Sequence, residues 1–245
     1  MPNIRLTIEY NGAGFHGWQR QPGLRTIQQE LLNAIKVATR EHIKEVTASG
    51  RTDAGVHAKA QVVNFHIEKE VDLEVLKKSI SSILKGELSV IDAQLVDQSF
   101  HSRFDSTLKT YKYTILNRST PAVLDRGRVW EIHQRLNFTR LQSNANLLEG
   151  IHDFKSFQGS GCAARTTTRT ILKSSFERDG EYLIYTIIGK GFLKQMVRNI
   201  VGTLVDIERG SLKEPCIKSI LACKDRRKAG VTAPAYGLCL ESVCY

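Results

Sequence analysis

A short polar loop followed by a mostly apolar run stands out between residues 49 and 65. Gly50 and Gly55 bracket the loop that carries Arg51 and Asp53. Glycines let a backbone turn sharply and let a bulky ligand approach it closely. The residues that follow alternate between two faces if they are extended, as in a strand. A carboxylate held on such a loop is well placed for reaction, so we predict that Asp53 carries the chemistry.

Three chemical roles are open to Asp53 from its neighbours alone. It could shape the loop through an Asx turn. It could bind a metal, but no second acidic residue lies near it in the sequence, which disfavours a metal site. It could act as a nucleophile or a base, with Arg51 two residues and His57 four residues away.

An aromatic and amide-rich loop precedes this region and includes Phe15 and Gln19. Its aromatic rings could be tucked beneath the loop. Alternatively, they could stack on unpaired bases while Arg20 and Arg25 bind phosphates. The residues that follow, Thr26-Ile27-Gln28-Gln29, predict a capping box at the start of a helix.

Elements that could position these loops follow in a regular order. We predict strands at 4–10, 46–48, 59–67 and 88–96, with helices from 27 to about 40 and at 73–84, the second with Leu76, Ile80 and Ile83 inward. The order strand, helix, strand, strand, helix, strand is that of a ferredoxin-like domain. The remaining segments predict a second such half, with strands at 111–116, 169–178, 182–188 and 237–243 and helices at 136–148, 193–208 and 214–222. We therefore expect an α+β protein with halves 1–104 and 105–245.

Composition narrows the class of protein. The 245 residues include 35 Lys and Arg against 25 Asp and Glu, a net charge of +10 that favours a polyanionic partner such as nucleic acid. Five cysteines without a Cys-x-x-Cys pair disfavour a disulfide framework or a zinc site. No apolar run is long enough to cross a membrane and no signal peptide is evident, so we expect a cytoplasmic protein with no membrane partner.

Several segments together resemble the tRNA pseudouridine synthase A family. They occur in the family's order over nearly the whole chain: Tyr10-Asn11-Gly12-x-x-Phe15-x-Gly17-Trp18-Gln19, Gly50-Arg51-Thr52-Asp53-Ala54-Gly55-Val56-His57-Ala58, Phe100-His101-Ser102-Arg103-Phe104, Tyr111-Lys112-Tyr113, Gly150-Ile151-His152-Asp153-Phe154, Phe192-Leu193-x-x-Met196-Val197-Arg198-Asn199-Ile200-Val201-Gly202 and Ala233-Pro234-x-x-Gly237-Leu238.

This resemblance implies an enzyme that isomerises uridine to pseudouridine at positions 38, 39 and 40 of the tRNA anticodon stem-loop. It implies no cofactor and no metal, a homodimer, and a tRNA partner. The implied fold is two ferredoxin-like halves that share a mixed, mostly antiparallel sheet, with a central active-site cleft.

The resemblance also assigns roles to residues. Asp53 matches the essential aspartate, which attacks the sugar or the base or starts an elimination; the sequence leaves these open. Arg198 matches the basic residue that pairs with it, and Tyr111 the active-site tyrosine. Arg51 and Leu238 match residues that hold the opened RNA and pack on the flipped base. Phe15 and Gln19 are further candidates for substrate binding.

Two other classes of function compete with this prediction. A catalytically inactive tRNA-binding or folding protein would keep the basic surface without the reaction. An RNA recognition motif would need an aromatic signature that this chain lacks.

Overall fold

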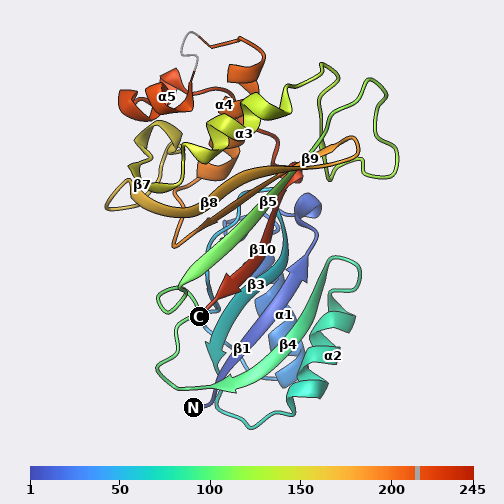
Figure 1. Ribbon diagram of the computed structural model, residues 1–245. Helices are drawn as coiled ribbons and strands as arrows, with labels where there is room; N and C mark the ends of the chain where they lie inside the picture. The colour runs from blue at the N-terminus through green and yellow to red at the C-terminus, as the bar shows by residue number, and fades with distance from the viewer. Residues whose placement is uncertain (213–215) are drawn as a thin grey trace. The chain divides into compact units, whose positions relative to one another are not determined.

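A computed structural model describes residues 1–212 and 216–245 and divides the chain into two compact units (Figure 1). Unit 1 comprises Met1–Thr107 and Cys239–Tyr245, and unit 2 comprises Leu108–Leu238. The last strand thus belongs to unit 1, whereas the sequence placed it in a half spanning 105–245. The reason is its pairing, because Cys239 and Leu240 lie beside His57 and Ala58 in a parallel ladder.

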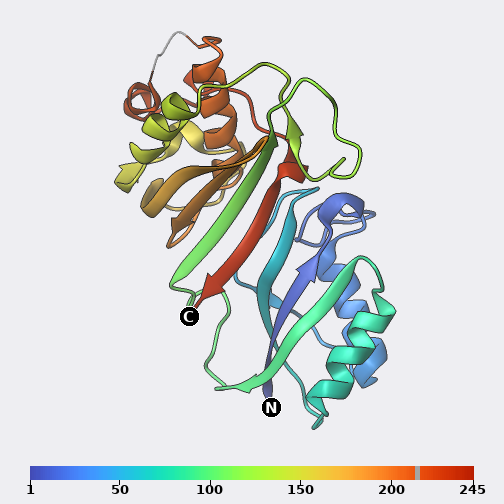
Figure 2. The same cartoon turned by 45° about the vertical axis from the view of Figure 1, so that its right-hand side comes forward.

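Unit 1 follows the predicted order of elements. Its elements are β1 (Asn3–Tyr10), α1 (Ile27–Thr39), β2 (Thr47–Ala48), β3 (His57–His66), α2 (Leu73–Ile83), β4 (Leu88–Val96) and β10 (Leu238–Cys244), whose first residue lies at the end of unit 2, with a short 3-10 helix at Gly12–Gly14. β1 pairs antiparallel with both β3 and β4, and β2 pairs antiparallel with β3. Both α1 and α2 lie on one face of these strands (Figure 2).

Alternation along β1 builds the core of unit 1. Ile4, Leu6 and Ile8 are fully buried, while the residues between them are more exposed. From α2, Leu76 and Ile80 join this core as predicted. The prediction for Ile83 was wrong, because this last residue of the helix is 44% exposed and the core is closed by the buried Leu84 instead.

The predicted capping box is also absent from the start of α1. The side chain of Thr26, the N-cap residue, makes no capping hydrogen bond. The amides of Ile27 and Gln28 instead donate to the carbonyl oxygens of Gly17 and Trp18, at 3.1 Å each. The preceding loop therefore satisfies the helix end that a side chain usually caps.

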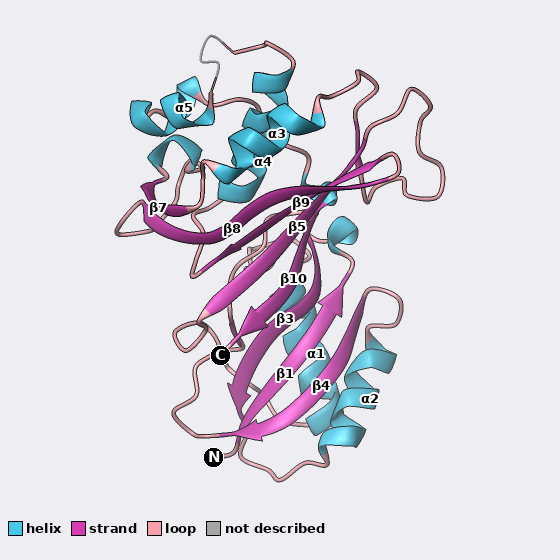
Figure 3. Ribbon diagram, in the orientation of Figure 1, coloured by secondary structure: helices cyan, strands magenta, loops and turns pink. Residues whose placement is uncertain are grey.

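Unit 2 contains strands β5 to β9, and its helices gather beside β8 and β9 (Figure 3). Its elements are β5 (Leu108–Leu116), β6 (Trp130–Glu131), α3 (Phe138–Asn146), β7 (Gly150–Asp153), β8 (Thr168–Asp179), β9 (Tyr182–Gly189), α4 (Met196–Glu208) and α5 (Ile217–Cys223), with 3-10 helices at Lys155–Phe157, Arg226–Lys228 and Ala235–Gly237. The strand order is β5-β9-β8-β7, all antiparallel, and β6 lies parallel to the end of β5.

The α+β class is confirmed in both units, and most predicted elements of unit 2 are present. The predicted helix at 214–222 begins outside the described residues and is described from Ile217. The helix predicted from 193 begins at Met196, because Gln195 adopts a left-handed conformation with φ 58°. No helix in the described ranges is long and apolar enough to span a membrane.

Candidate active site

The loop that carries Asp53 is a tight turn at the start of β3. The amide of Val56 donates to the carbonyl oxygen of Asp53 at 3.1 Å, and Gly55 takes φ 80°. A positive φ at this third position is the geometry of a type II turn, which glycine adopts without strain. Asp53 is half-buried and Arg51 is exposed. The turn therefore presents the carboxylate on a constrained backbone.

Hydrogen bonds from buried neighbours fix the residue before Asp53. The hydroxyl groups of Tyr10 and Thr52 lie 2.8 Å apart, and the amide of Trp18 donates to the Thr52 carbonyl at 3.0 Å. Burial raises the pKa of Tyr10, so its hydroxyl stays protonated. On the other side, Gln61 donates to the carbonyl of Gly50 at 2.8 Å. Both flanks of the Asp53 turn are held in place.

Two glycines of the N-terminal loop lie against the Asp53 turn. A methyl group at Gly12 would overlap the carbonyl oxygen of Val56 and lie 2.6 Å from its carbon. A methyl group at Gly17, which has φ 86°, would lie 2.9 Å from the Thr52 oxygen and 3.2 Å from the Asp53 carbonyl carbon. These glycines are therefore required for backbone to pack on backbone.

Phe15 and Gln19 are placed differently from an exposed stacking surface. Phe15 is 4% exposed, and the guanidinium of Arg25 lies 4.7 Å from its ring centroid. Gln19 donates to the side chain of Gln28 at 3.1 Å, beside a small cavity of about 190 Å³. Of the two interpretations of this loop, the structure has the aromatic rings tucked beneath it.

Tyr111 lies in β5 of unit 2 and is almost buried. Its ring meets that of Phe192 edge-on, with the centroids 5.2 Å apart and an interplanar angle of 86°. Its backbone pairs with Ile187 of β9. The ring is thus fixed by an aromatic neighbour and by a paired strand.

Arg198 lies in the first turn of α4 and binds the segment that leads to Leu238. Its Nε donates to the carbonyl of Ala233 at 2.8 Å, and the amide of Ala233 donates to the Arg198 carbonyl at 3.2 Å. Arg198 is therefore more than an arginine on a helix surface, because it holds the 233–238 segment.

Tyr113 holds the same segment from β5. Its hydroxyl donates to the carbonyl of Pro234 at 2.8 Å, and a methyl group at Gly237 would lie 2.6 Å from its ring. Leu238, the next residue, is 6% exposed. Burial raises the pKa of Tyr113, which keeps the hydroxyl protonated as a donor.

A buried asparagine connects α4 to the residues just before this segment. Asn199 accepts from Thr232 at 2.7 Å and from Arg226 at 3.1 Å, and it donates to the carbonyl of Phe157 at 2.9 Å. A methyl group at Gly202 would lie 2.8 Å from the carbonyl carbon of Val231. These supports were not predicted from the sequence, although Asn199 and Gly202 lie within one of the quoted motifs.

The predicted site residues thus fall into two groups. Arg51 and Asp53 share one turn in unit 1, while Tyr111, Arg198 and Leu238 lie in unit 2, where the last two are joined through the 233–238 segment. Among the described residues, no group of three or more His, Cys, Asp or Glu could hold a metal ion.

Comparisons with known proteins agree with the motifs. A model of the tRNA pseudouridine synthase family matches residues 6–105 and 145–245. A tRNA pseudouridine synthase A 2 of Clostridium perfringens is 42% identical, and a tRNA pseudouridine synthase A of Clostridium kluyveri is 41% identical, each over 100% of both chains. A solved archaeal box H/ACA Nop10–Cbf5 complex shares 12% identity at a TM-score of 0.32, and the match covers 79% of this chain and 42% of that chain.

The match of the family model over most of the chain, with full-length relatives above 40% identity, shows that this protein belongs to the tRNA pseudouridine synthase A family.

Proposed function

We propose that this enzyme isomerises uridine to pseudouridine at positions 38, 39 and 40 of the tRNA anticodon stem-loop, with Asp53 as the essential catalyst. The observation that supports this most is the built turn around Asp53. A half-buried carboxylate stands on a backbone that is held by Thr52 and packed against two glycines of another loop. Such pre-organisation is what a reacting group needs.

The reaction rearranges one bond without an external reactant. The bond from the ribose to N1 of the base breaks, the base turns, and C5 bonds to the ribose. C5 loses its proton and N1 takes one up, so that the product is an isomer of the substrate. Asp53 serves as a nucleophile toward the sugar or the base, or as the base that starts an elimination. Each route needs the carboxylate ionised, and the guanidinium of Arg198, its expected partner, would favour that form.

The remaining residues act on the displaced base and the RNA. Tyr111 offers a ring that Phe192 already holds edge-on, and Leu238 offers an apolar side chain at the end of the anchored segment. Arg51 is exposed beside Asp53 and would hold the opened strand. Phe15 and Gln19 contribute by supporting the loop under Asp53, because Phe15 is buried and Gln19 bonds Gln28.

We further propose that the enzyme acts in the cytoplasm as a homodimer that binds tRNA. The net charge of +10 suits a partner whose shape is read through its phosphates. No cofactor or metal is part of the proposed chemistry.

The decisive experiment compares Asp53→Asn with wild type on unmodified tRNA that carries uridine at positions 38 to 40. We expect wild type to form pseudouridine there, and Asp53→Asn to form none while its tRNA affinity stays within a few-fold. Asp72→Asn is a matched control, because Asp72 caps α2 through Glu74 and Val75, and asparagine caps a helix equally well.

Other results would change the proposal in defined ways. Turnover by Asp53→Asn would remove Asp53 as the catalyst. Tight binding without modification by wild type would favour the tRNA-binding protein. Pseudouridine at other positions would keep the reaction and discard the positions.

A further inference from the structure

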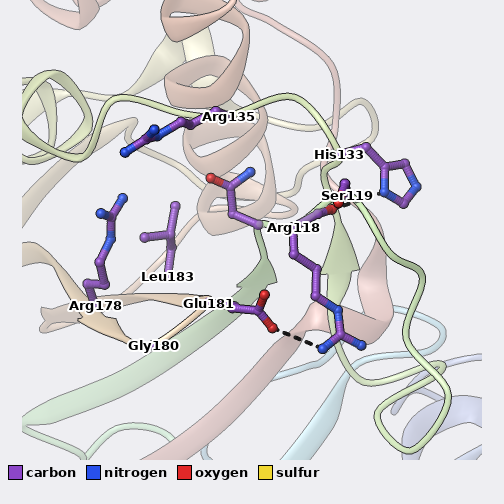
Figure 4. Close-up of a pocket in the computed structure, with 9 residues that line it drawn as sticks. Arg118, Ser119, His133, Arg135, Arg178, Gly180, Glu181 and Leu183 are labelled. Carbon is purple, nitrogen blue, oxygen red and sulfur yellow. Dashed lines mark hydrogen bonds and ion pairs between the residues drawn. The ribbon is translucent and has the colours of Figure 1, made fainter.

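A basic pocket lies in unit 2 where β5 and β8 end and β9 begins. It encloses about 330 Å³, and Figure 4 shows the residues around it. The lining includes Asn117, Arg118, His133, Arg135, Arg178 and Glu181, which we call the arginine pocket. None of these residues belongs to the proposed catalytic group.

Arg118 is committed to holding the pocket together. Its Nη1 pairs with Oε2 of Glu181 at 3.0 Å, and its Nε and Nη2 donate to the carbonyls of Thr120 and Pro121 at 3.0 and 3.1 Å. Glu181 is the one acidic side chain in the lining, and it is neutralised by this ion pair. Any further positive charge in the pocket is therefore left uncompensated by the lining itself.

Arg135 and Arg178 supply that charge. Both are exposed, and in Figure 4 their guanidinium groups lie on the same side of the pocket and face one another. Within residues 1–212 and 216–245 neither forms an ion pair, although the guanidinium of Arg178 lies 5.2 Å from the ring centroid of Phe138. Two guanidinium groups that face one another repel, and an anion between them would relieve the repulsion.

The backbone that carries Arg135 is fixed in place. Asn117, at the end of β5, donates to the carbonyls of Ile132 and Gln134 at 2.8 Å each and accepts from the amide of Leu136 at 3.1 Å. These bonds clamp both sides of Arg135. The pocket is thus a prepared site, whose charged groups sit on a constrained frame.

We propose that the arginine pocket binds a backbone phosphate of the tRNA, remote from the target base. Guanidinium forks match phosphate oxygens in pairs, which makes arginine well suited to this contact. The volume of about 330 Å³ leaves room for the sugar beside the phosphate. This inference rests on the proposed function, because that function supplies the RNA.

The position of the pocket sets which part of the tRNA it meets. Asn117 lies six residues beyond Tyr111, directly after the last residue of β5. At about 3.4 Å per residue this is a distance of roughly 20 Å. The bound phosphate therefore lies several nucleotides from the target base, and the contact depends on tRNA outside the immediate target.

The test uses the double variant Arg135→Gln/Arg178→Gln in the full chain. Arg126→Gln is the matched control, because Arg126 is an exposed arginine of unit 2 that does not line the pocket. Affinity is measured for full-length tRNA and for an isolated anticodon stem-loop over a range of salt concentrations. Thermal unfolding and molar mass in solution are recorded for each variant.

We expect the double variant to bind full-length tRNA about tenfold more weakly, with a salt dependence shallower by about one counterion. We expect the control to bind like wild type and the stem-loop affinity to change less than that of full-length tRNA. If the double variant is folded and binds full-length tRNA as tightly as the control does, the inference is overturned.

Two further readouts separate other ligands from RNA. The first is calorimetry with inorganic phosphate. If wild type binds phosphate, the double variant does not, and both bind tRNA equally tightly, then the pocket holds a free anion and the RNA contact is refuted. A change in molar mass of the double variant alone would assign it to contact between copies of the chain. Failure of wild type to form pseudouridine refutes the proposed function separately, since these measurements record binding.

Discussion

The contact between Gly12 and the Asp53 turn yields the sharpest test of the proposed site. In Gly12→Ala, the new methyl group would lie 2.6 Å from the carbonyl carbon of Val56, whereas ordinary contact begins at 3.4 Å. The two loops must therefore separate by at least 0.8 Å, the difference of these distances. Both sides of this contact are backbone, so no flexible side chain can absorb the movement.

The displacement has a cost in stability and a larger one in rate. Overpacking costs about 1–3 kcal/mol, which corresponds to a fall in melting temperature of roughly 2–12 °C for a chain of this size. A misplacement of about 1 Å at a reacting group can lower the rate about 100-fold. We expect Gly12→Ala to slow single-turnover pseudouridine formation by about 10- to 100-fold, with tRNA affinity within a few-fold of wild type.

Gly14 offers a control within the same 3-10 helix. A methyl group at Gly14 would meet only side-chain atoms, Glu87 Oε1 at 3.3 Å and Arg25 Nη1 at 3.6 Å, which can move. We expect Gly14→Ala to keep a rate within about threefold of wild type. Equal rates for folded Gly12→Ala and Gly14→Ala would refute the idea that backbone packing sets the position of Asp53.

Three other outcomes can be checked with the same preparations. Tyr113→Phe should lower the free energy of unfolding by about 1–3 kcal/mol, because the carbonyl of Pro234 loses the donor of its 2.8 Å hydrogen bond while the ring contact remains. Chemical denaturation measures this free energy, and an unchanged value would mean that the hydrogen bond does not support the fold. The pKa of Glu87 is lowered in the folded protein because both Nη atoms of Arg25 donate to its carboxylate. Its contribution to stability is therefore present above the unfolded-state pKa of about 4.3, and it is lost as the pH falls through the lower pKa of the folded state. The free energies of unfolding of wild type and Arg25→Gln should therefore converge between pH 5 and pH 3, by roughly 1 kcal/mol or less at this exposed pair. Curves of stability against pH that stay parallel would contradict the assignment. Finally, tRNA affinity should fall steeply as salt rises, since several phosphate contacts release counterions, and a flat response would exclude a phosphate-reading surface.

The helices and strands could be predicted from the sequence because the spacing of apolar residues is a local property. The strand predicted at 88–96 is β4 without any change of boundary, and the alternation from Tyr111 marks β5. Errors arose where tertiary contacts replaced local ones. The Thr26 capping box failed because loop carbonyls already accept from the helix amides, and the two-residue β6 has no period to detect.

The candidate site was predictable only in part. Its reactive carboxylate was marked by flanking glycines, but its supports come from distant segments. Gly12 meets Val56 across more than forty positions, and Arg198 meets Ala233 across more than thirty. The arginine pocket joins residues near 118, 135 and 178, so no linear spacing could have indicated it.

The two units share one means of placing a proposed site residue, which is close packing on a glycine that has no room for a methyl group. Gly12 and Gly17 pack on the backbone of the Asp53 turn, Gly202 packs on the backbone of Val231 and Ala233, and Gly237, just before Leu238, packs on the ring of Tyr113. Such contacts fix position without charge, whereas the arginine pocket supplies charge beyond the end of β5 that lies away from Tyr111. Alanine at the four glycines should therefore lower the rate more than tRNA affinity, and loss of the pocket arginines should do the reverse. If both sets of variants lowered the rate and the tRNA affinity in the same proportion, positioning and binding would not be separate in this enzyme.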